Sequence, residues 1–287
     1  MLFFLHIPKT AGTTFQFILE NSLGLKHCHL GHLGYKSADQ RDFEFARKFF
    51  PWMRSIAGHN LCDPMRFVAP DPYYITFLRE PIARSFSEYQ DNVTRGKSKL
   101  TFEEMLRADD AMTNIQVKRI AGKADLDRAK SNLEKFSFVG LMEKFDLSLH
   151  MLQKFCPVRL NYGYKRKVTA RDNSIRKALE SDSRMVDMAR EHNRLDIELY
   201  DFTVKEIFPK FLAQTGFLAT DKVASFERYK SELQPNFLLH RFYNQTLFRN
   251  VLKVYKKRRL RETMLLALVS VQQSIMFFVE ATPETVF

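Results

Sequence analysis

The stretch that most constrains the fold lies at the start of the chain, in residues 3–15, which read FFLHIPKTAGTTF. Residues 2–5 are an apolar run that predicts a short buried strand, and this run breaks at Pro8. From Phe15 to Leu23 the apolar residues return at near-helical spacing. We therefore expect a strand, a tight loop and a helix, in that order.

The loop between this strand and this helix has the residues of an anion-binding turn. A loop that opens a helix presents free backbone N–H groups and the positive end of the helix dipole, and both suit a phosphate. Gly12 lets the backbone approach an anion, and Lys9 adds a mobile charge. Because Lys9 precedes the glycine, the loop is not the G-x-x-x-x-G-K-[ST] sequence of magnesium-dependent nucleotide-binding proteins.

Two further predicted strands end at polar side chains. Residues 53–57 form a short strand that is followed by the pair Gly58-His59. Residues 73–78 are an aromatic and β-branched run followed by Arg79, and Pro81 then suits the first turn of a helix. Since open α/β sheets bind their ligands at the carboxyl edge of the strands, His59 and Arg79 are candidate site residues.

These segments resemble motifs of the sulfotransferases that use 3′-phosphoadenosine 5′-phosphosulfate (PAPS). The closest resemblance is to the carbohydrate branch that contains heparan-sulfate 2-O-sulfotransferase and its bacterial relatives. Residues 6–14 resemble the loop that binds the 5′-phosphosulfate, and Arg79 with Ser87 eight positions later resembles the pair that grips the 3′-phosphate. Gly58-His59 is similar to the pair that holds the catalytic base. The resemblance covers about residues 1–215.

The resemblance implies an α/β fold with a central parallel sheet and helices on both faces, followed by a helical C-terminal extension. The implied reaction moves a sulfuryl group from PAPS to a hydroxyl of a carbohydrate acceptor, such as a surface or capsular glycan, a glycolipid or an oligosaccharide, and releases PAP. His59 would be the general base, and Lys9 would stabilise the leaving phosphate. The expected donor-binding residues are Pro8, Lys9, Thr10, Ala11, Gly12, Thr13, Thr14, Arg79, Ser87 and, in a late basic loop, Lys165 and Arg166. For that basic loop, contact with an anionic acceptor and a solvated run of charges are the alternatives.

Other motifs predict structure more than chemistry. Residues 26–32 (KHCHLGH) suggest a metal site, but they lack a second ligand pair of the zinc type, so we predict a glycine-punctuated loop and no metal. Residues 39–50 predict an amphipathic helix, residues 101–104 (TFEE) a capping box, and residues 136–146 a strand and a turn into a helix. Residues 114–122 resemble a family segment beside the site, with Lys118 where arginine is usual; an ordinary solvated helix is the alternative.

The net charge and the cysteine content indicate which classes of partner and which compartment to expect. The 287 residues carry a formal net charge of +12, which favours an anionic ligand, an anionic polymer or a membrane surface. No zinc-finger or RRM signature is present, so we expect no nucleic-acid partner. Three cysteines do not suggest a disulfide framework, and the N-terminal apolar run is too short for a signal peptide. We therefore expect a cytoplasmic protein.

We expect residues 1–215 to form the PAPS-binding domain and residues 216–287 a helical extension. In that extension a basic cluster, residues 256–259, precedes an apolar run, residues 263–279. Such a segment suits a helix on the anionic inner face of a membrane, and a helix packed on the domain or in a dimer is the alternative. Two rival functions remain open, a magnesium-dependent kinase and a non-catalytic binder of an anionic glycan or lipid.

Overall fold

The computed structural model describes residues 1–30, 37–108, 112–164, 173–227 and 233–259 of the chain. The chain divides into two compact units, Met1–Arg241 and Phe242–Phe287, and the first unit contains the sheet and the predicted site. No helix in the described part of the chain has the length together with the hydropathy that a bilayer crossing needs.

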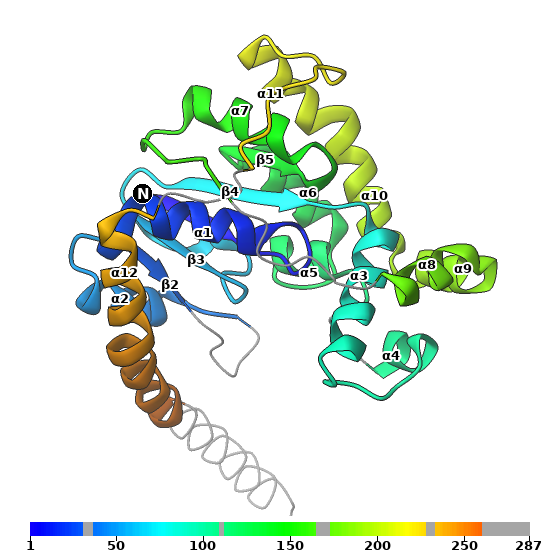
Figure 1. Cartoon of the computed structure of the whole chain (residues 1–287), viewed down its shortest axis with the longest axis horizontal. Coiled ribbons are helices and arrows are strands. Elements are labelled where there is room, and N and C mark those ends of the chain that lie inside the picture. Colours follow the sequence, from blue (N-terminus) through cyan, green and yellow to red (C-terminus); the bar gives the residue numbers. More distant parts are fainter. Residues whose placement is uncertain (31–36, 109–111, 165–172, 228–232, 260–287) are drawn as a thin grey trace, which may run out of the picture. The chain divides into compact units, whose positions relative to one another are not determined.

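A five-stranded parallel sheet forms the centre of the first unit (Figure 1). In the register, Leu5 lies opposite both Gly58 and Thr76, so three strands end close together. The strand order is β2-β3-β1-β4-β5. The strands are β1 (Leu2–Leu5), β2 (His27–His29), β3 (Ser55–Gly58), β4 (Tyr73–Leu78) and β5 (Phe138–Leu141).

Helices cover both faces of this sheet, as predicted. Successive side chains of a strand point to opposite faces. Phe3 packs against Phe43 of α2 (Gln40–Phe49), with ring centroids 5.5 Å apart, whereas Phe4 packs against Phe15 of α1 (Gly12–Leu23) at 4.8 Å. All four residues of β1 are fully buried between these helices, which explains why the chain begins with an uninterrupted apolar run.

Two of the helices match specific predictions from the sequence. The helix after β4 starts with Pro81 at its first position, and the expected amphipathic helix at 39–50 is α2. After Asp182 the chain forms two consecutive helices that are separated at Asn193. The helices are α3 (Pro81–Thr94), α4 (Phe102–Ala108), α5 (Ile115–Ala121), α6 (Leu126–Lys135), α7 (Phe145–Phe155), α8 (Ser174–Ser181), α9 (Ser183–His192), α10 (Arg194–Phe202), α11 (Phe208–Thr215) and α12 (Pro235–Phe242).

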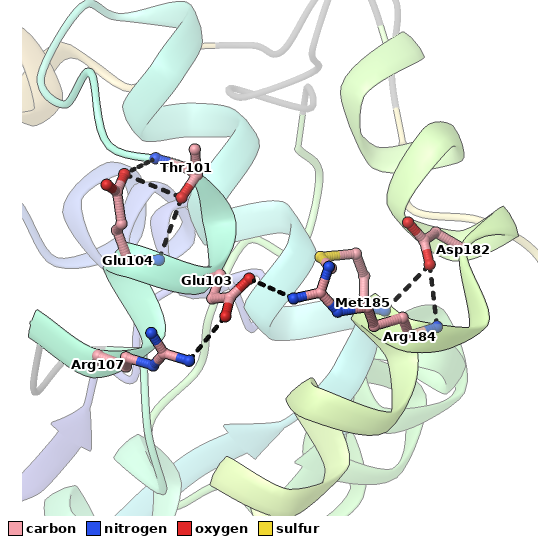
Figure 2. A network of polar contacts seen from close by, with 7 residues as sticks. All are labelled: Thr101, Glu103, Glu104, Arg107, Asp182, Arg184 and Met185. Atoms are coloured by element: carbon pink, nitrogen blue, oxygen red, sulfur yellow. Dashed lines mark hydrogen bonds and ion pairs between the residues drawn. The ribbon is translucent and has the colours of Figure 1, made fainter.

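The carboxyl end of β4 points toward a group of helices that includes α3, α4, α8 and α9 (Figure 1). This group has its own apolar core around Phe86, Phe102 and Met105. The predicted capping box is present, because the Glu104 side chain accepts from the Thr101 N–H and the Glu104 N–H donates to the Thr101 hydroxyl oxygen (Figure 2). On the surface, a carboxylate of α4 pairs with arginines of α4 and α9, in the pairs Glu103–Arg107 and Glu103–Arg184.

One prediction from the sequence is wrong at residues 26–32. We expected a loop there, whereas His27–His29 form β2, an edge strand parallel to β3. The run is too short and too polar to show strand periodicity. These polar residues can form a buried strand because the ring of His27 lies 3.1 Å from Ser55 Oγ. This contact provides a hydrogen-bond partner for one ring nitrogen inside the protein. The strand predicted at 53–57 is observed at Ser55–Gly58.

Candidate active site

The connection between β1 and α1 adopts a conformation that suits an anion. Lys9 and Ala11 have φ angles of 67° and 64°, in the left-handed region that non-glycine residues seldom adopt. Such residues in alternation turn backbone N–H groups into a concave anion-binding nest. At the start of α1, the N–H groups of Thr14 and Phe15 both donate to the Ala11 carbonyl. The amides that precede Thr14 in this turn are the candidates to bind an anion.

The predicted loop residues differ in what they offer. The Thr10 hydroxyl donates to the Ile7 carbonyl at 3.0 Å and is buried, so this side chain shapes the turn. Thr13 is exposed and Thr14 is half-buried at the start of α1, where a hydroxyl can meet a ligand. Pro8 is half-buried beside them. The loop therefore offers backbone amides and two hydroxyls.

Gly12 is required for a reason that the sequence did not show. Its φ is not in the positive range, so no conformational demand selects glycine. A Cβ at this position would lie 2.0 Å from Cδ2 of His6, which means that the imidazole occupies the space of a side chain. The same imidazole lies against the ring of His59, with centroids 4.0 Å apart. His6 therefore fills the space between the turn and the end of β3.

Lys9 is held by a carboxylate from α3. Its Nζ lies 3.4 Å from Oδ1 of Asp91, and Asp91 also contacts Arg95 at 2.9 Å and Lys97 at 3.3 Å. Burial alone raises the pKa of Asp91, but Lys9 and Arg95 outweigh it, and the pKa lies below its usual value. One carboxylate thus faces three cations, and this cluster has an excess of positive charge.

Arg79 follows β4 and reaches back to the loop. Its Nη1 donates to the Lys9 carbonyl at 3.1 Å, and the residue is only 6% exposed. Burial, with Arg176 also nearby, lowers the pKa of Arg79 to about 10, so the guanidinium is still charged at neutral pH. Ser87 lies half-buried on α3, one helical turn before Asp91. The carboxylates of Glu143 and Glu80 stabilise part of the charge on Arg79, and Arg176 and Arg84 oppose them, so an anionic ligand would stabilise the guanidinium further.

His59 follows β3 directly, at the same edge of the sheet. Its Nδ1 lies 2.7 Å from the His6 carbonyl, and because a carbonyl only accepts, Nδ1 carries the proton. The lone pair of the neutral ring is then on Nε2, as a general base requires. The preceding Gly58 is needed for packing, since a Cβ there would lie 2.6 Å from the Leu30 carbonyl oxygen.

The structure therefore brings together the loop 8–14, His59 and Arg79 at the carboxyl ends of β1, β3 and β4, where the predictions had put them. The predicted donor-binding residues Lys165 and Arg166 lie outside the described residues. Sequence reasoning missed the ion pair of Asp91 with Lys9. The one available signal was its place one helical turn after Ser87.

Comparisons with known proteins give one family and two similar proteins. A family model described as "Sulfotransferase family" matches residues 1–203. Heparan-sulfate 6-O-sulfotransferase 2 of Gallus gallus is 24% identical over 273 residues, which cover 72% of this chain and 66% of that protein. The chain thus spans slightly less than two thirds of the relative's length. A solved sulfotransferase from Alicyclobacillus acidocaldarius aligns with a TM-score of 0.37 and 14% identity, over 66% of this chain and 94% of that structure.

Proposed function

Since this chain belongs to the sulfotransferase family, we propose that it transfers a sulfuryl group from PAPS to a hydroxyl of a carbohydrate. The observation that carries the proposal is the meeting of three groups at one edge of the sheet: the amide-rich loop with Lys9, the buried Arg79 and the oriented His59. PAPS supplies the sulfuryl group and leaves as PAP.

The residues present fit a donor with phosphates at two positions. The backbone N–H groups of residues 9–13, with the hydroxyls of Thr13 and Thr14, would hold the 5′-phosphate at the N-terminus of α1. Arg79 and Ser87 would hold the 3′-phosphate, and the planar guanidinium suits two phosphate oxygens. Lys165 and Arg166 are proposed as further contacts. No metal is needed in this proposal, because basic groups compensate the phosphate charge.

His59 and Lys9 would have different roles in the reaction. Nε2 of His59 would take the proton from the acceptor hydroxyl, while the His6 carbonyl keeps the ring in the correct tautomer. Lys9 would stabilise the charge that develops on the phosphate oxygen of the departing nucleotide. For this role its Nζ must be shared between Asp91 and the phosphate, and the two cations on Asp91, Arg95 and Lys97, make that sharing favourable.

The similar protein and the net charge of the chain support a carbohydrate acceptor. The relative's name gives heparan sulfate as its substrate and a 6-O position, whereas the motifs resemble the 2-O branch most closely. The 6-O and the 2-O positions are both hydroxyls of a carbohydrate in an anionic polymer. A chain with a net charge of +12 suits such an acceptor. We therefore propose a glycan acceptor, and the position of the hydroxyl is left to experiment.

One experiment tests the proposal directly. The full chain is incubated with PAPS and a panel of neutral and uronate-containing oligosaccharides, and the products are analysed by mass spectrometry. We expect a product that has gained one sulfate group, together with an equal amount of PAP. A protein that binds the glycans without any sulfated product would instead be a non-catalytic binder, and sulfate transfer would then be wrong.

A further inference from the structure

Helix α5 links the two halves of the proposed site. It runs from Ile115 to Ala121 and lies between two residues in the left-handed conformation, Asn114 with φ 47° and Gly122 with φ 80°. Two of its side chains, Gln116 and Arg119, are three residues apart and therefore project from neighbouring positions on the helix. They reach two different strand ends.

Gln116 binds the backbone on both sides of Arg79. Its Oε1 accepts from the Arg79 N–H at 3.0 Å, and its Nε2 donates to the Arg79 carbonyl at 2.9 Å. The carboxamide is fully buried, so an unmatched polar group here would be costly. This pair of bonds fixes the backbone from which the Arg79 side chain leaves the sheet.

Arg119 binds the segment that carries His59. Its Nη1 donates to the His59 carbonyl at 2.7 Å and lies 3.3 Å from Sγ of Cys62. In the opposite direction, the Asp63 N–H donates to the Arg119 carbonyl at 2.9 Å. Residues 59–63 are thus bound to α5 at both ends, and the ring of His59 sits on a fixed backbone.

Helix α5 is itself anchored to the core by a buried carboxylate. Asp196 of α10 accepts from the N–H groups of Gln116 at 3.1 Å and Val117 at 2.8 Å. Asp196 is fully buried, and its own N–H donates to the Asn114 side chain at 3.2 Å. The first turn of α5 therefore cannot slide without breaking charge-assisted hydrogen bonds.

We propose that Gln116 and Arg119 are positioning residues of the sulfotransferase site, with separate tasks: Gln116 sets Arg79 for the 3′-phosphate, and Arg119 sets His59 for the acceptor hydroxyl. The inference rests on the proposed function. It adds that one short helix fixes the distance between the donor anchor and the base. A displacement of about 1 Å at a reacting group lowers the rate about 10²-fold, so a helix that fixes this distance would preserve the rate.

The test compares variants at the two positions. Gln116→Glu keeps the shape and the acceptor but loses the donor to the Arg79 carbonyl, and it should weaken PAP binding about tenfold with kcat at saturating PAPS little changed. Arg119→Met should lower kcat by about 10–100-fold and leave the Kd for PAP within about twofold. Arg119→Lys should recover part of kcat, because an ammonium can still reach one carbonyl. Calorimetry and initial rates give these numbers.

A matched control removes the same charge elsewhere. Arg107 pairs with Glu103 on the surface of α4 (Figure 2), and Arg107→Met should change neither PAP binding nor kcat. A merely structural role would lower PAP affinity and kcat together in both the Gln116 and the Arg119 variants, and that outcome would overturn the proposal. Unchanged PAP affinity in Gln116→Glu would also overturn it.

A readout without turnover separates this inference from the proposed function. The ring resonances of His59 in the protein alone should shift in Arg119→Met and not in Arg107→Met. If the wild-type chain sulfates no acceptor but these shifts occur, the proposed reaction fails while the positioning of His59 by Arg119 stands. If the ring resonances are the same in all three proteins, Arg119 does not position His59.

Discussion

At the scale of single residues, two neighbouring histidines have different environments. His6 is buried, and its burial, with the nearby His59 and His29, holds its pKa well below the usual value, so His6 is neutral across the physiological range. His59 is only half-buried and is fixed in one tautomer by the His6 carbonyl. His6 therefore suits packing under Gly12, and His59 suits proton transfer.

Replacement of the base should separate binding from chemistry. We expect His59→Ala to lower kcat by about 10²–10⁴ while the Kd for PAP stays the same, because the proposed role of the ring is to take the proton of the acceptor hydroxyl and not to bind the nucleotide. Initial rates at saturating PAPS and calorimetry with PAP measure the two quantities. Wild-type turnover in this variant would mean that another histidine is the base, and His6, His29 and His32, the last of which lies outside the described residues, would be tested next.

Arg79 should discriminate between nucleotides. The wild-type chain should bind PAP far more tightly than AMP or ATP. Arg79→Ala should lose about 2–4 kcal/mol of binding free energy for PAP, because it removes the buried charge that we propose as the partner of the 3′-phosphate. AMP binding should be nearly the same in both proteins. Calorimetric titrations with PAP and AMP measure this, and equal affinities for the two nucleotides in the wild type would contradict the assignment.

At the scale of elements, β2 and α12 are joined by a pair of buried imidazoles. Nε2 of His240 lies 3.0 Å from the His27 carbonyl, and the two rings are 5.6 Å apart. Burial lowers the pKa of His27 well below its usual value and that of His240 to about 4. Both rings are thus neutral in the folded protein at neutral pH.

This pair should make the protein sensitive to acid. Below about pH 6.5 the unfolded chain takes up protons on these histidines and the folded protein does not, so the free energy of unfolding falls as the pH falls from about 6.5 to about 4. His240 alone should account for about 2–3 kcal/mol over this interval. Urea titrations at several pH values measure the slope.

The matched comparison uses two Gln variants. His240→Gln should reduce the pH dependence of the free energy of unfolding, because the unfolded chain then has one fewer histidine to protonate. His192→Gln on α9 should leave most of this pH dependence in place. Equal slopes in the wild type and in His240→Gln would show that the buried pair does not control the acid sensitivity.

At the scale of the whole molecule, the positive charge is unevenly distributed along the sequence. Residues 233–261 contain no Asp or Glu, and they include the basic cluster 256–259. Within the second unit, Phe242, Leu247 and Val254 are exposed apolar side chains. Basic residues together with exposed apolar ones suit an anionic membrane surface, which we propose as a partner of this segment.

Flotation with lipid vesicles tests this partner. The full chain should float with phosphatidylserine vesicles at low salt and not with neutral vesicles. Changing Lys256, Lys257, Arg258 and Arg259 to Gln should abolish flotation, since each contributes about 1 kcal/mol near such a surface. Four Gln changes at Arg107, Lys177, Arg184 and Arg190 remove the same charge from helices of the first unit and should preserve it. Flotation that is the same in both quadruple variants would exclude this role for the cluster.

The sequence by itself determined the local secondary structure of several segments of this protein. The strand, loop and helix at residues 2–23, the proline start of α3 and the capping box of α4 were all predictable, because hydrophobic period, turn residues and caps act within about fifteen residues. It also identified His59 and Arg79 as candidates, since each directly follows a strand and parallel strands end at one edge. Their roles stay predictions.

Only the tertiary structure decided how these residues are held. The ring of His6 in the space beside Gly12 and the bonds of Gln116 and Arg119 to two strand ends give no signal in the local sequence spacing. The ion pair of Lys9 with Asp91 has only one such signal, the place of Asp91 one helical turn after Ser87. The edge strand β2 is a similar case, because its polar residues become a strand only beside β3. The physical reason is that such contacts join segments distant in sequence, and their partners are chosen by packing and by the cost of leaving buried polar groups unpaired.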